Sequence, residues 1–226
     1  MEAVILCGGL GTRLRSVLAD RPKCLAPVKK KTYLDYLAAF LERQGIERII
    51  FATGYLSEQV EDWAHKERRP WKFSISKEET PMGTGGALRL AATHISSSQF
   101  LAFNGDTFLD VHCQKFMQFH TACKADVSLA AVQVPDATNY GSLEIEGNKV
   151  NHFNEKGMSG PGIINAGAYA IRKEFILQLP LKPMSFEKEI ATKPDAKIFG
   201  FLLDGVFLDI GTPANLAMID KISYLR

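Results

Sequence analysis

The sequence has few cysteines and no long hydrophobic run. Its four cysteines lie far apart and form no Cys-x-x-Cys pair, so the sequence predicts neither a disulfide framework nor a zinc site. No apolar stretch reaches the roughly 20 residues that a membrane-spanning helix needs. The first residues carry no basic segment ahead of their short apolar stretch, which is not the pattern of a secretory signal. We therefore expect a cytoplasmic protein that does not associate with membranes.

The net charge is also small, because the chain has 27 Lys and Arg residues and 25 Asp and Glu residues, which gives +2. This balance argues against a protein that binds nucleic acid through net charge. The five histidines show no metal-ligand spacing, and no linker, repeat or low-complexity tract divides the chain. With 46% hydrophobic residues the chain can bury a full core, which excludes disorder and predicts a single domain over residues 1–226.

Short apolar segments alternate with amphipathic segments in the first half of the chain, about residues 1–110. Helices are predicted from the Thr32-x-x-Asp35 capping pattern to Gly45, and at residues 58–65 and 87–93. This alternation predicts an α/β, Rossmann-like fold with a mostly parallel sheet flanked by helices. The strand-forming runs that alternate with these helices are residues 3–6, 48–52, 71–75 and 100–103.

The second half, about residues 111–226, is richer in strands and predicts an added β-rich portion. A hairpin is expected within residues 142–153, turning at Gly147-Asn148, and another turn at Asp204-Gly205 is expected to join two strands as a hairpin. Pro213 is expected to begin a closing helix. We expect the first half to bind a nucleotide and the second half to bind a second substrate. The other strands expected here are residues 127–134, 166–171, 197–203 and 206–209.

A glycine-rich loop, residues 8–14, follows the first predicted strand. Its glycines let main-chain N–H groups converge on phosphate oxygens. A dinucleotide-binding oxidoreductase would need a small residue where Leu14 stands, and a Walker A loop would need a closing Gly-Lys-Ser/Thr. Instead Arg13 lies within the loop and Lys23 follows it. Two cations beside a nest of amides fit a triphosphate whose leaving group gains charge.

The glycine loop and the following Pro22-Lys23-Cys24-Leu25-Ala26-Pro27-Val28 resemble the sugar-1-phosphate nucleotidyltransferases, and the resemblance covers nearly the whole chain. It implies the glycosyltransferase-A-like nucleotidyltransferase fold, with a sugar-binding second half. It also implies that Lys23 contacts phosphates at the reacting centre. Cys24 replaces the proline of most members, which we expect to change the stiffness of the loop and not its chemistry. The residues of this region implied to bind the nucleotide are Leu6, Gly8, Gly9, Gly11, Thr12, Arg13 and Lys23.

A second glycine-rich segment, residues 81–86, opens a predicted helix. Glycines at a helix start let a flat ligand pack against the main chain. In the family this segment receives the nucleobase and ribose, and the Gly85-Gly86 pair is similar to members that activate heptose or mannose phosphates with GTP. The residues implied to bind the nucleotide here are Pro81, Gly83, Thr84, Gly85 and Gly86.

Two aspartates, Asp106 and Asp209, follow separate predicted strands. Parallel sheets bind ligands at the C-terminal ends of their strands, and two converging carboxylates form an oxygen site that suits Mg²⁺. Either aspartate alone is as well explained by capping a turn. The resemblance implies that the pair holds Mg²⁺, and that Arg13, Lys23 and Asp106 are catalytic.

Three further segments resemble the family's sugar pocket, although each also has a plainer explanation as a hairpin turn, a surface ion pair or a strand bend. The resemblance implies that Glu155 accepts hydrogen bonds from sugar hydroxyls and that Lys156 holds the sugar phosphate. It also implies that Asn165 presents its amide to the sugar. The implied sugar-binding residues are Asn104, Tyr140, Gly141, Glu155, Lys156 and Asn165.

The implied activity is transfer of a nucleoside monophosphate from a nucleoside triphosphate to a sugar 1-phosphate, with Mg²⁺ as cofactor. GTP and D-glycero-D-manno-heptose 1-phosphate are the favoured substrates. Guanylyl transfer to mannose 1-phosphate, uridylyl transfer to N-acetylmuramate 1-phosphate and thymidylyl transfer to glucose 1-phosphate stay open. A nucleotide-sensing regulatory subunit without catalysis is disfavoured, because all four residues Arg13, Lys23, Asp106 and Asp209 are present. The sequence leaves open whether the chain forms a homo-oligomer.

Overall fold

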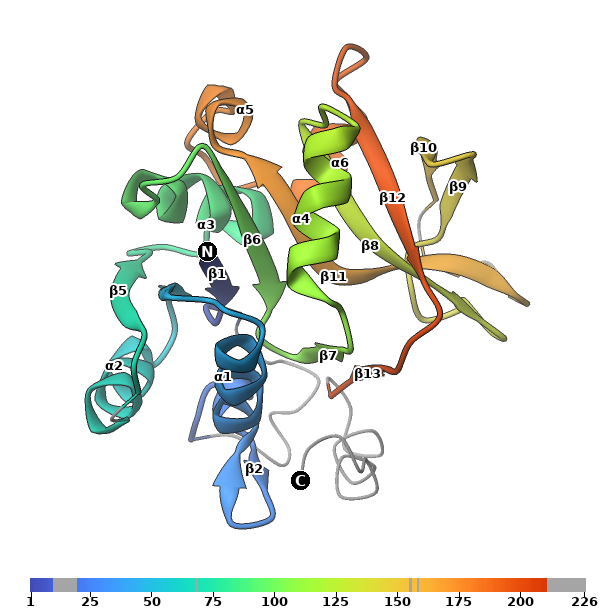
Figure 1. The fold of residues 1–226 in the computed structure, drawn as a ribbon. Helices are drawn as coiled ribbons and strands as arrows, with labels where there is room; N and C mark the ends of the chain where they lie inside the picture. Colours follow the sequence, from blue (N-terminus) through green and yellow to red (C-terminus); the bar gives the residue numbers. More distant parts are fainter. Residues whose placement is uncertain (10–19, 68, 155, 158, 211–226) are drawn as a thin grey trace.

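The computed structural model describes residues 1–9, 20–67, 69–154, 156–157 and 159–210. Within these residues, nine strands form one twisted sheet through the middle of the molecule (Figure 1). Its strands are β1 (Glu2–Leu6), β4 (Arg48–Thr53), β5 (Lys72–Lys77), β6 (Gln99–Asn104), β8 (Val127–Val134), β9 (Leu143–Glu146), β10 (Lys149–Phe153), β11 (Gly162–Arg172) and β12 (Ile198–Leu203), in the order β5-β4-β1-β6-β11-β8-β12-β10-β9.

The first half of the sheet has the predicted alternating pattern. β5, β4, β1 and β6 are parallel neighbours, and helices α1 (Tyr33–Arg43), α2 (Ser57–Lys66) and α3 (Gly83–Ala91) connect them along the chain. The expected cap of α1 is confirmed. The main-chain N–H of Asp35 donates to the Thr32 hydroxyl at 3.4 Å, and that of Thr32 donates to the Asp35 carboxylate at 2.6 Å. Two otherwise unpaired donors at the helix start are thereby satisfied.

The expected β-rich portion continues the same sheet. β11 is antiparallel to both β6 and β8, and β12 is parallel to β8, so β8 and β12 run in the same direction as β6. Because β1, β4 and β5 share that direction, the sheet is mixed but mostly parallel, as predicted. The hairpin of β9 and β10 is confirmed, and Gly147 in its turn has a φ of 59°, which favours glycine. The helices of this half are α4 (Cys113–Ala122), α5 (Lys173–Gln178) and α6 (Phe186–Ala191). The predicted helix from Pro213 lies outside the described residues.

The hairpin expected at Asp204-Gly205 is wrong. Both edges of β12 are already occupied, by β8 and β10, so the chain cannot fold back onto it after the turn. It crosses instead to a separate two-stranded sheet, where β13 (Phe207–Asp209) pairs antiparallel with β7 (Thr107–Leu109). The remaining short elements are the sheet of β2 (Pro27–Val28) with β3 (Lys31–Thr32), and the 3₁₀ turns η2 (Lys23–Leu25) and η3 (Ala92–His94).

Each face of the large sheet has its own hydrophobic core. Successive side chains of a strand point to opposite faces, so Ala3 and Ile5 of β1 join one core, with α1, α2 and α4, while Val4 joins the other, with α3, α5 and α6. A fully buried aliphatic side chain contributes about 1.5–3 kcal/mol. The two cores thus hold the ends of the central strands in fixed positions. Among the described residues, no helix has the length and hydrophobicity to span a membrane.

Candidate active site

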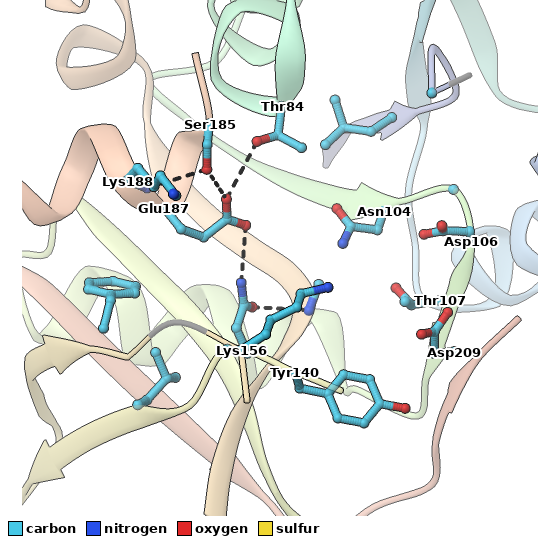
Figure 2. A pocket seen from close by; sticks show the side chains of 18 of the residues that line it. Thr84, Asn104, Asp106, Thr107, Tyr140, Lys156, Ser185, Glu187, Lys188 and Asp209 are labelled. Carbon is cyan, nitrogen blue, oxygen red and sulfur yellow. Dashed lines mark hydrogen bonds between the residues drawn. The ribbon is translucent and has the colours of Figure 1, made fainter. Parts of the chain in front are cut away.

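A cavity of about 880 Å³ opens at the C-terminal ends of β1 and β6, and β11 and α6 also border it (Figure 2). This is the edge at which parallel sheets bind ligands. The structure brings together most of the described site residues that the sequence predicted. Those that line the cavity are Leu6, Gly9, Lys23, Thr84, Asn104, Asp106, Tyr140, Gly141, Lys156, Asn165 and Asp209. Gly11, Thr12, Arg13 and Glu155 lie outside the described residues, and their roles stay predictions.

The start of the glycine loop packs against the neighbouring strand. The main-chain N–H of Cys7 donates to the carbonyl of Ala52 at 2.7 Å, which extends the pairing of β1 and β4 by one residue. A side chain at Gly8 would have its Cβ 3.2 Å from the main-chain nitrogen of Gly54, whereas one at Gly9 would meet open space. Close packing therefore accounts for Gly8, while Gly9 lines the cavity, where a ligand can reach its main chain.

Lys23 and Asp106 form an ion pair at the floor of the cavity. The Lys23 amine donates to the Asp106 carboxylate at 3.3 Å, and their side chains are 17% and 28% exposed. Gly105, which precedes Asp106 in the turn after β6, packs closely on the end of β1. Its N–H donates to the Leu6 carbonyl at 3.0 Å, and a Cβ at this position would lie 2.5 Å from the same oxygen. The Asn104-Gly105-Asp106 turn is thus fixed to the end of β1, the strand that leads into the glycine-rich loop.

Asp209 reaches the same end of the cavity through the small sheet. It is paired in register with Thr107, and the N–H of Ile210 donates to the Asp106 carbonyl at 2.9 Å. Figure 2 shows Asp106, Thr107 and Asp209 together at one side of the pocket. Two carboxylates are a hard oxygen donor set that suits Mg²⁺, which usually takes one or two carboxylates and fills its remaining positions with substrate phosphates and water. Among the described residues no cluster of three or more His, Cys, Asp or Glu side chains could hold a metal by itself.

The predicted base-binding glycines pack against the protein's own chain. The N–H of Gly85 donates to the Met184 carbonyl at 3.0 Å, and Cβ atoms at Gly83 and Gly86 would lie 2.5 and 2.6 Å from the carbonyl oxygens of Met184 and Lys182. Packing against residues 182–184 therefore accounts for these glycines. Their contact with a nucleotide, and that of Pro81, stays a prediction.

An acidic residue that sequence reasoning missed, Glu78, joins this region to the glycine loop. Its carboxylate accepts a hydrogen bond from the main-chain N–H of Met82 at 3.0 Å. A Cβ at Gly8 or Gly54 would lie 2.9 or 2.5 Å from its other oxygen. Burial raises the pKa of the Glu78 carboxyl group. The two glycines thus leave room for a carboxylate that fixes the turn before α3.

The predicted sugar-binding residues that the structure describes do not all lie on one side of the cavity, since Asn104 lies beside Asp106 (Figure 2). Tyr140 packs edge-on against Phe207, with ring centroids 5.6 Å apart, and so connects the wall to β13. Figure 2 shows the Lys156 side chain extending across the pocket toward Asn104 and Thr107. Amine and carboxylate groups therefore face one another across a space that a sugar phosphate could enter.

Asn165 is committed to bonds within the protein. Its amide nitrogen donates to the Tyr169 hydroxyl at 2.9 Å and to the Glu187 carboxylate at 3.3 Å, while its oxygen accepts from the N–H of Gly167 at 3.0 Å. Sequence reasoning missed Glu187, Ser185 and Lys188, which also line the cavity. The available signal was a helix cap, because the Ser185 hydroxyl accepts from the N–H of Lys188 at 3.4 Å.

Comparison with known proteins agrees with this geometry. The model of the nucleotidyl transferase family matches residues 2–220. The chain is 37% identical, over 98% of its length and 97% of the relative's, to a D-glycero-alpha-D-manno-heptose 1-phosphate guanylyltransferase of Aneurinibacillus thermoaerophilus. It is also 32% identical to the mannose-1-phosphate guanylyltransferase catalytic subunit beta of Danio rerio, over 95% of this chain and 62% of that protein.

Solved structures show the same similarity. HddC from Yersinia pseudotuberculosis complexed with GMP-PN has a TM-score of 0.88 and 36% sequence identity, over 97% of this chain and 98% of that one. A putative glucose-1-phosphate thymidylyltransferase from Bacillus anthracis has a TM-score of 0.83 at 18% identity, over 99% and 95% of the two chains, and shares the fold. The chain therefore belongs to the nucleotidyl transferase family, as its motifs predicted.

Proposed function

We propose that this protein transfers the guanylyl group of GTP to D-glycero-D-manno-heptose 1-phosphate, giving the nucleotide sugar and pyrophosphate. The observation that carries the proposal is the arrangement of charge in the cavity. Asp106 and Asp209 lie at one side, and Lys156 extends toward them from the other (Figure 2). Lys23 is paired with Asp106 and also lines the cavity. Two phosphate groups can thus be held face to face. The names of the relatives in A. thermoaerophilus and of the HddC complex with GMP-PN support the choice of donor and acceptor.

The reaction needs alignment more than acid–base chemistry. A phosphate monoester is largely ionised near pH 7, so no side chain has to remove a proton from it. One of its oxygens attacks the α-phosphorus of GTP, and the bond from that phosphorus to the bridging oxygen of the β-phosphate breaks. Pyrophosphate leaves with the electron pair. The protein has to bring two anions together and to offset their repulsion.

We assign these tasks to the cations of the site. Lys156 would hold the acceptor phosphate, Lys23 the α-phosphate, and Arg13 of the glycine loop the departing pyrophosphate. Asp106 and Asp209 would hold Mg²⁺, which when bound neutralises charge on the phosphates. Release of Lys23 from its ion pair with Asp106 would then free its amine for the phosphate. We place this reaction in the cytoplasm.

A panel of substrates tests the proposal. Each of the four common nucleoside triphosphates is incubated with the 1-phosphates of D-glycero-D-manno-heptose, mannose, N-acetylmuramate and glucose, and pyrophosphate release is measured. We expect the highest kcat/KM for GTP with the heptose 1-phosphate. Preference for UTP or dTTP would contradict the donor assignment. Absence of turnover with every pair, together with GTP binding, would favour the nucleotide-sensing regulatory subunit.

Mannose 1-phosphate is the second candidate acceptor. The relative in Danio rerio supports it, since it is a mannose-1-phosphate guanylyltransferase with 32% identity to this chain. Mannose and the heptose have the same arrangement of ring hydroxyls and differ in the exocyclic carbons. The kcat/KM ratio of these two acceptors therefore decides between the candidates.

A further inference from the structure

The cavity contains a carboxylate that none of the sequence motifs assigns to a substrate, Glu187 in the first turn of α6. One of its oxygens accepts hydrogen bonds from the Tyr169 hydroxyl at 2.5 Å and from the Asn165 amide at 3.3 Å. The other oxygen accepts from the Ser185 hydroxyl at 3.1 Å and from the Thr84 hydroxyl at 3.5 Å. Four donors from α3, β11 and the N-cap of α6 thus fix one acidic group that lines the pocket. Figure 2 shows the contacts from Thr84 and Ser185.

The network leaves Asn165 without a free donor. A primary amide has two N–H groups, and those of Asn165 are directed to Tyr169 and Glu187. The hydroxyl of Tyr169 is fully buried and donates to the same carboxylate. Neither side chain can offer a hydrogen to a substrate without breaking this arrangement. Both are therefore placed to hold Glu187. An ionised carboxylate is a pure acceptor with about four lone-pair positions, and the four protein donors meet all of them. The contact from the Thr84 hydroxyl, at 3.5 Å, is the longest of the four, so it is the one that a substrate hydroxyl can replace.

The chemistry of the substrates decides what such an acceptor can bind. Phosphate groups near pH 7 carry few hydrogens to donate, and their negative charge repels a carboxylate. Hydroxyl groups donate readily, and a hydrogen bond to a charged acceptor contributes about 1.5–3 kcal/mol. In the proposed reaction the available donors are the ring and exocyclic hydroxyls of the acceptor sugar, the ribose hydroxyls of GTP and the N1–H and N2–H groups of guanine. The bonds of Glu187 to Asn165 and its place on the wall with Lys156 favour the sugar ring.

We propose that Glu187 binds a ring hydroxyl of the sugar 1-phosphate, and that Asn165 and Tyr169 are positioning residues that hold its carboxylate. This inference rests on the proposed function, because it needs a sugar phosphate in the cavity. It changes the role that the sequence predicted for Asn165, from a direct sugar ligand to a support for one. It also places the sugar site next to Thr84 on α3, a predicted nucleotide-binding residue, because Thr84 contacts the same carboxylate.

The test combines a protein variant with a change in the substrate. The probes are mannose 1-phosphate, which shares the ring hydroxyls of the heptose, and its monodeoxy analogues, each lacking one ring hydroxyl. For the wild type, one analogue should lose about 10–100-fold in kcat/KM relative to mannose 1-phosphate. In Glu187→Ala, the kcat/KM values of mannose 1-phosphate and of that analogue should agree within about twofold, because the contact with the hydroxyl is already absent.

Conservative variants separate positioning from folding. Tyr169→Phe removes the buried hydroxyl without touching the cavity wall, so we expect a several-fold higher KM for mannose 1-phosphate, with kcat and the KM for GTP within about twofold of the wild type. Asn165→Ala should raise the same KM. Tyr36→Phe is the matched control, because within the described part of the chain its hydroxyl bonds only to the Val28 carbonyl, at 3.4 Å, and it does not line the cavity. Thermal unfolding of each variant shows whether it is folded.

The outcomes distinguish this inference from the proposed function. Suppose that folded Glu187→Ala or Glu187→Gln turns over sugar 1-phosphates at the wild-type rate and still loses as much kcat/KM as the wild type when the ring hydroxyl is removed. This result would overturn the role of Glu187 and leave the proposed function standing. Loss of the penalty for 2′- or 3′-deoxy GTP instead would assign Glu187 to the ribose and also overturn the inference. Absence of pyrophosphate release with every sugar 1-phosphate would refute the function and this inference together.

Discussion

The amine of Lys23 lies 3.3 Å from the carboxylate of Asp106, a residue 83 positions further along the chain. The pair exists because the 3₁₀ turn η2 and the turn after β6 meet at one edge of the sheet, where Gly105 is bonded to Leu6. Among the described residues, neither side chain forms a second ion pair. The ion pair thus holds the Lys23 amine and the Asp106 carboxylate at the cavity, where we expect phosphates to bind.

The metal pair is tested by removing one charge at a time. In Asp106→Asn and Asp209→Asn we expect turnover to fall by orders of magnitude while the protein stays folded, because each loses one hard oxygen ligand for Mg²⁺. Excess Mg²⁺ should partly restore either variant. Asp204→Asn, at an exposed turn, is the matched control and should behave as wild type. Wild-type rates across a Mg²⁺ titration in both site variants would refute the assignment.

Gly105 allows a second test, of the turn that carries Asp106. A methyl group at this position would lie 2.5 Å from the Leu6 carbonyl oxygen, so either β1 or the turn has to move. We expect Gly105→Ala to lower the free energy of unfolding by about 1–3 kcal/mol and to reduce kcat by displacing Asp106. Urea unfolding and pyrophosphate release measure the two effects. Unchanged stability and rate would mean that the contact with Leu6 does not constrain the site.

Much of this edge of the sheet could be predicted from the sequence. Asn104-Gly105-Asp106 follows an apolar strand, and parallel strands bring their C-terminal ends together, so local pattern and fold class suffice to place Asp106. The hairpin of β9 and β10 could also be predicted from a local signal, the Gly147-Asn148 pair between two strand-forming runs. The positive φ of Gly147 agrees with that signal.

Contacts between distant segments could not be predicted in this way. β7 and β13 have three residues each, too few to show a period, so their pairing and the failure of the hairpin at Asp204-Gly205 left no local signal. Glu187 is a similar case. Its partners Thr84, Asn165 and Tyr169 lie 18 to 103 positions away, and only the packing of α6 against α3 and β11 brings them together.

A buried histidine outside the site predicts how stability depends on pH. His120 is fully buried, its Nδ1 lies 2.9 Å from the Ser128 hydroxyl, and its Nε2 has no hydrogen-bond partner among the described residues. Burial lowers its pKa to about 4, with nearby Asp126 opposing and Arg172 reinforcing the shift. The native state thus excludes a proton that the unfolded chain binds below its ordinary pKa of about 6.5.

The sign of the effect follows from this difference. As the pH falls from about 6.5 toward 4, the unfolded state gains a proton and the native state does not, so the protein loses up to about 3 kcal/mol of stability through His120. Above this range the contribution is constant. His120→Gln cannot titrate and should flatten this part of the curve of unfolding free energy against pH. The exposed His152→Gln is the control, and identical slopes in all three proteins would contradict the prediction.

The last prediction separates an enzyme from a nucleotide sensor and concerns Lys23 and Arg13. Lys23 lines the cavity next to Asp106, and its position after Pro22 limits the freedom of the main chain around it. Arg13 lies outside the described residues, in the glycine loop. A contact that strengthens in the transition state is seen in kcat and not only in binding. Loss of one such charged contact typically lowers the rate by about 10²–10³.

We therefore expect Lys23→Ala and Arg13→Ala to bind GTP only modestly more weakly while losing most of their turnover. Arg13→Lys should not restore the full rate, because an ammonium group lacks the planar fork of donors that a guanidinium presents to phosphate. Lys30→Ala, an exposed lysine seven positions after Lys23, is the matched control. Calorimetry gives the affinity for GTP and pyrophosphate release gives the rate. If affinity collapses while turnover at saturating GTP is normal, these cations only hold the nucleotide, and the charge that develops on the leaving pyrophosphate must be stabilised by other groups.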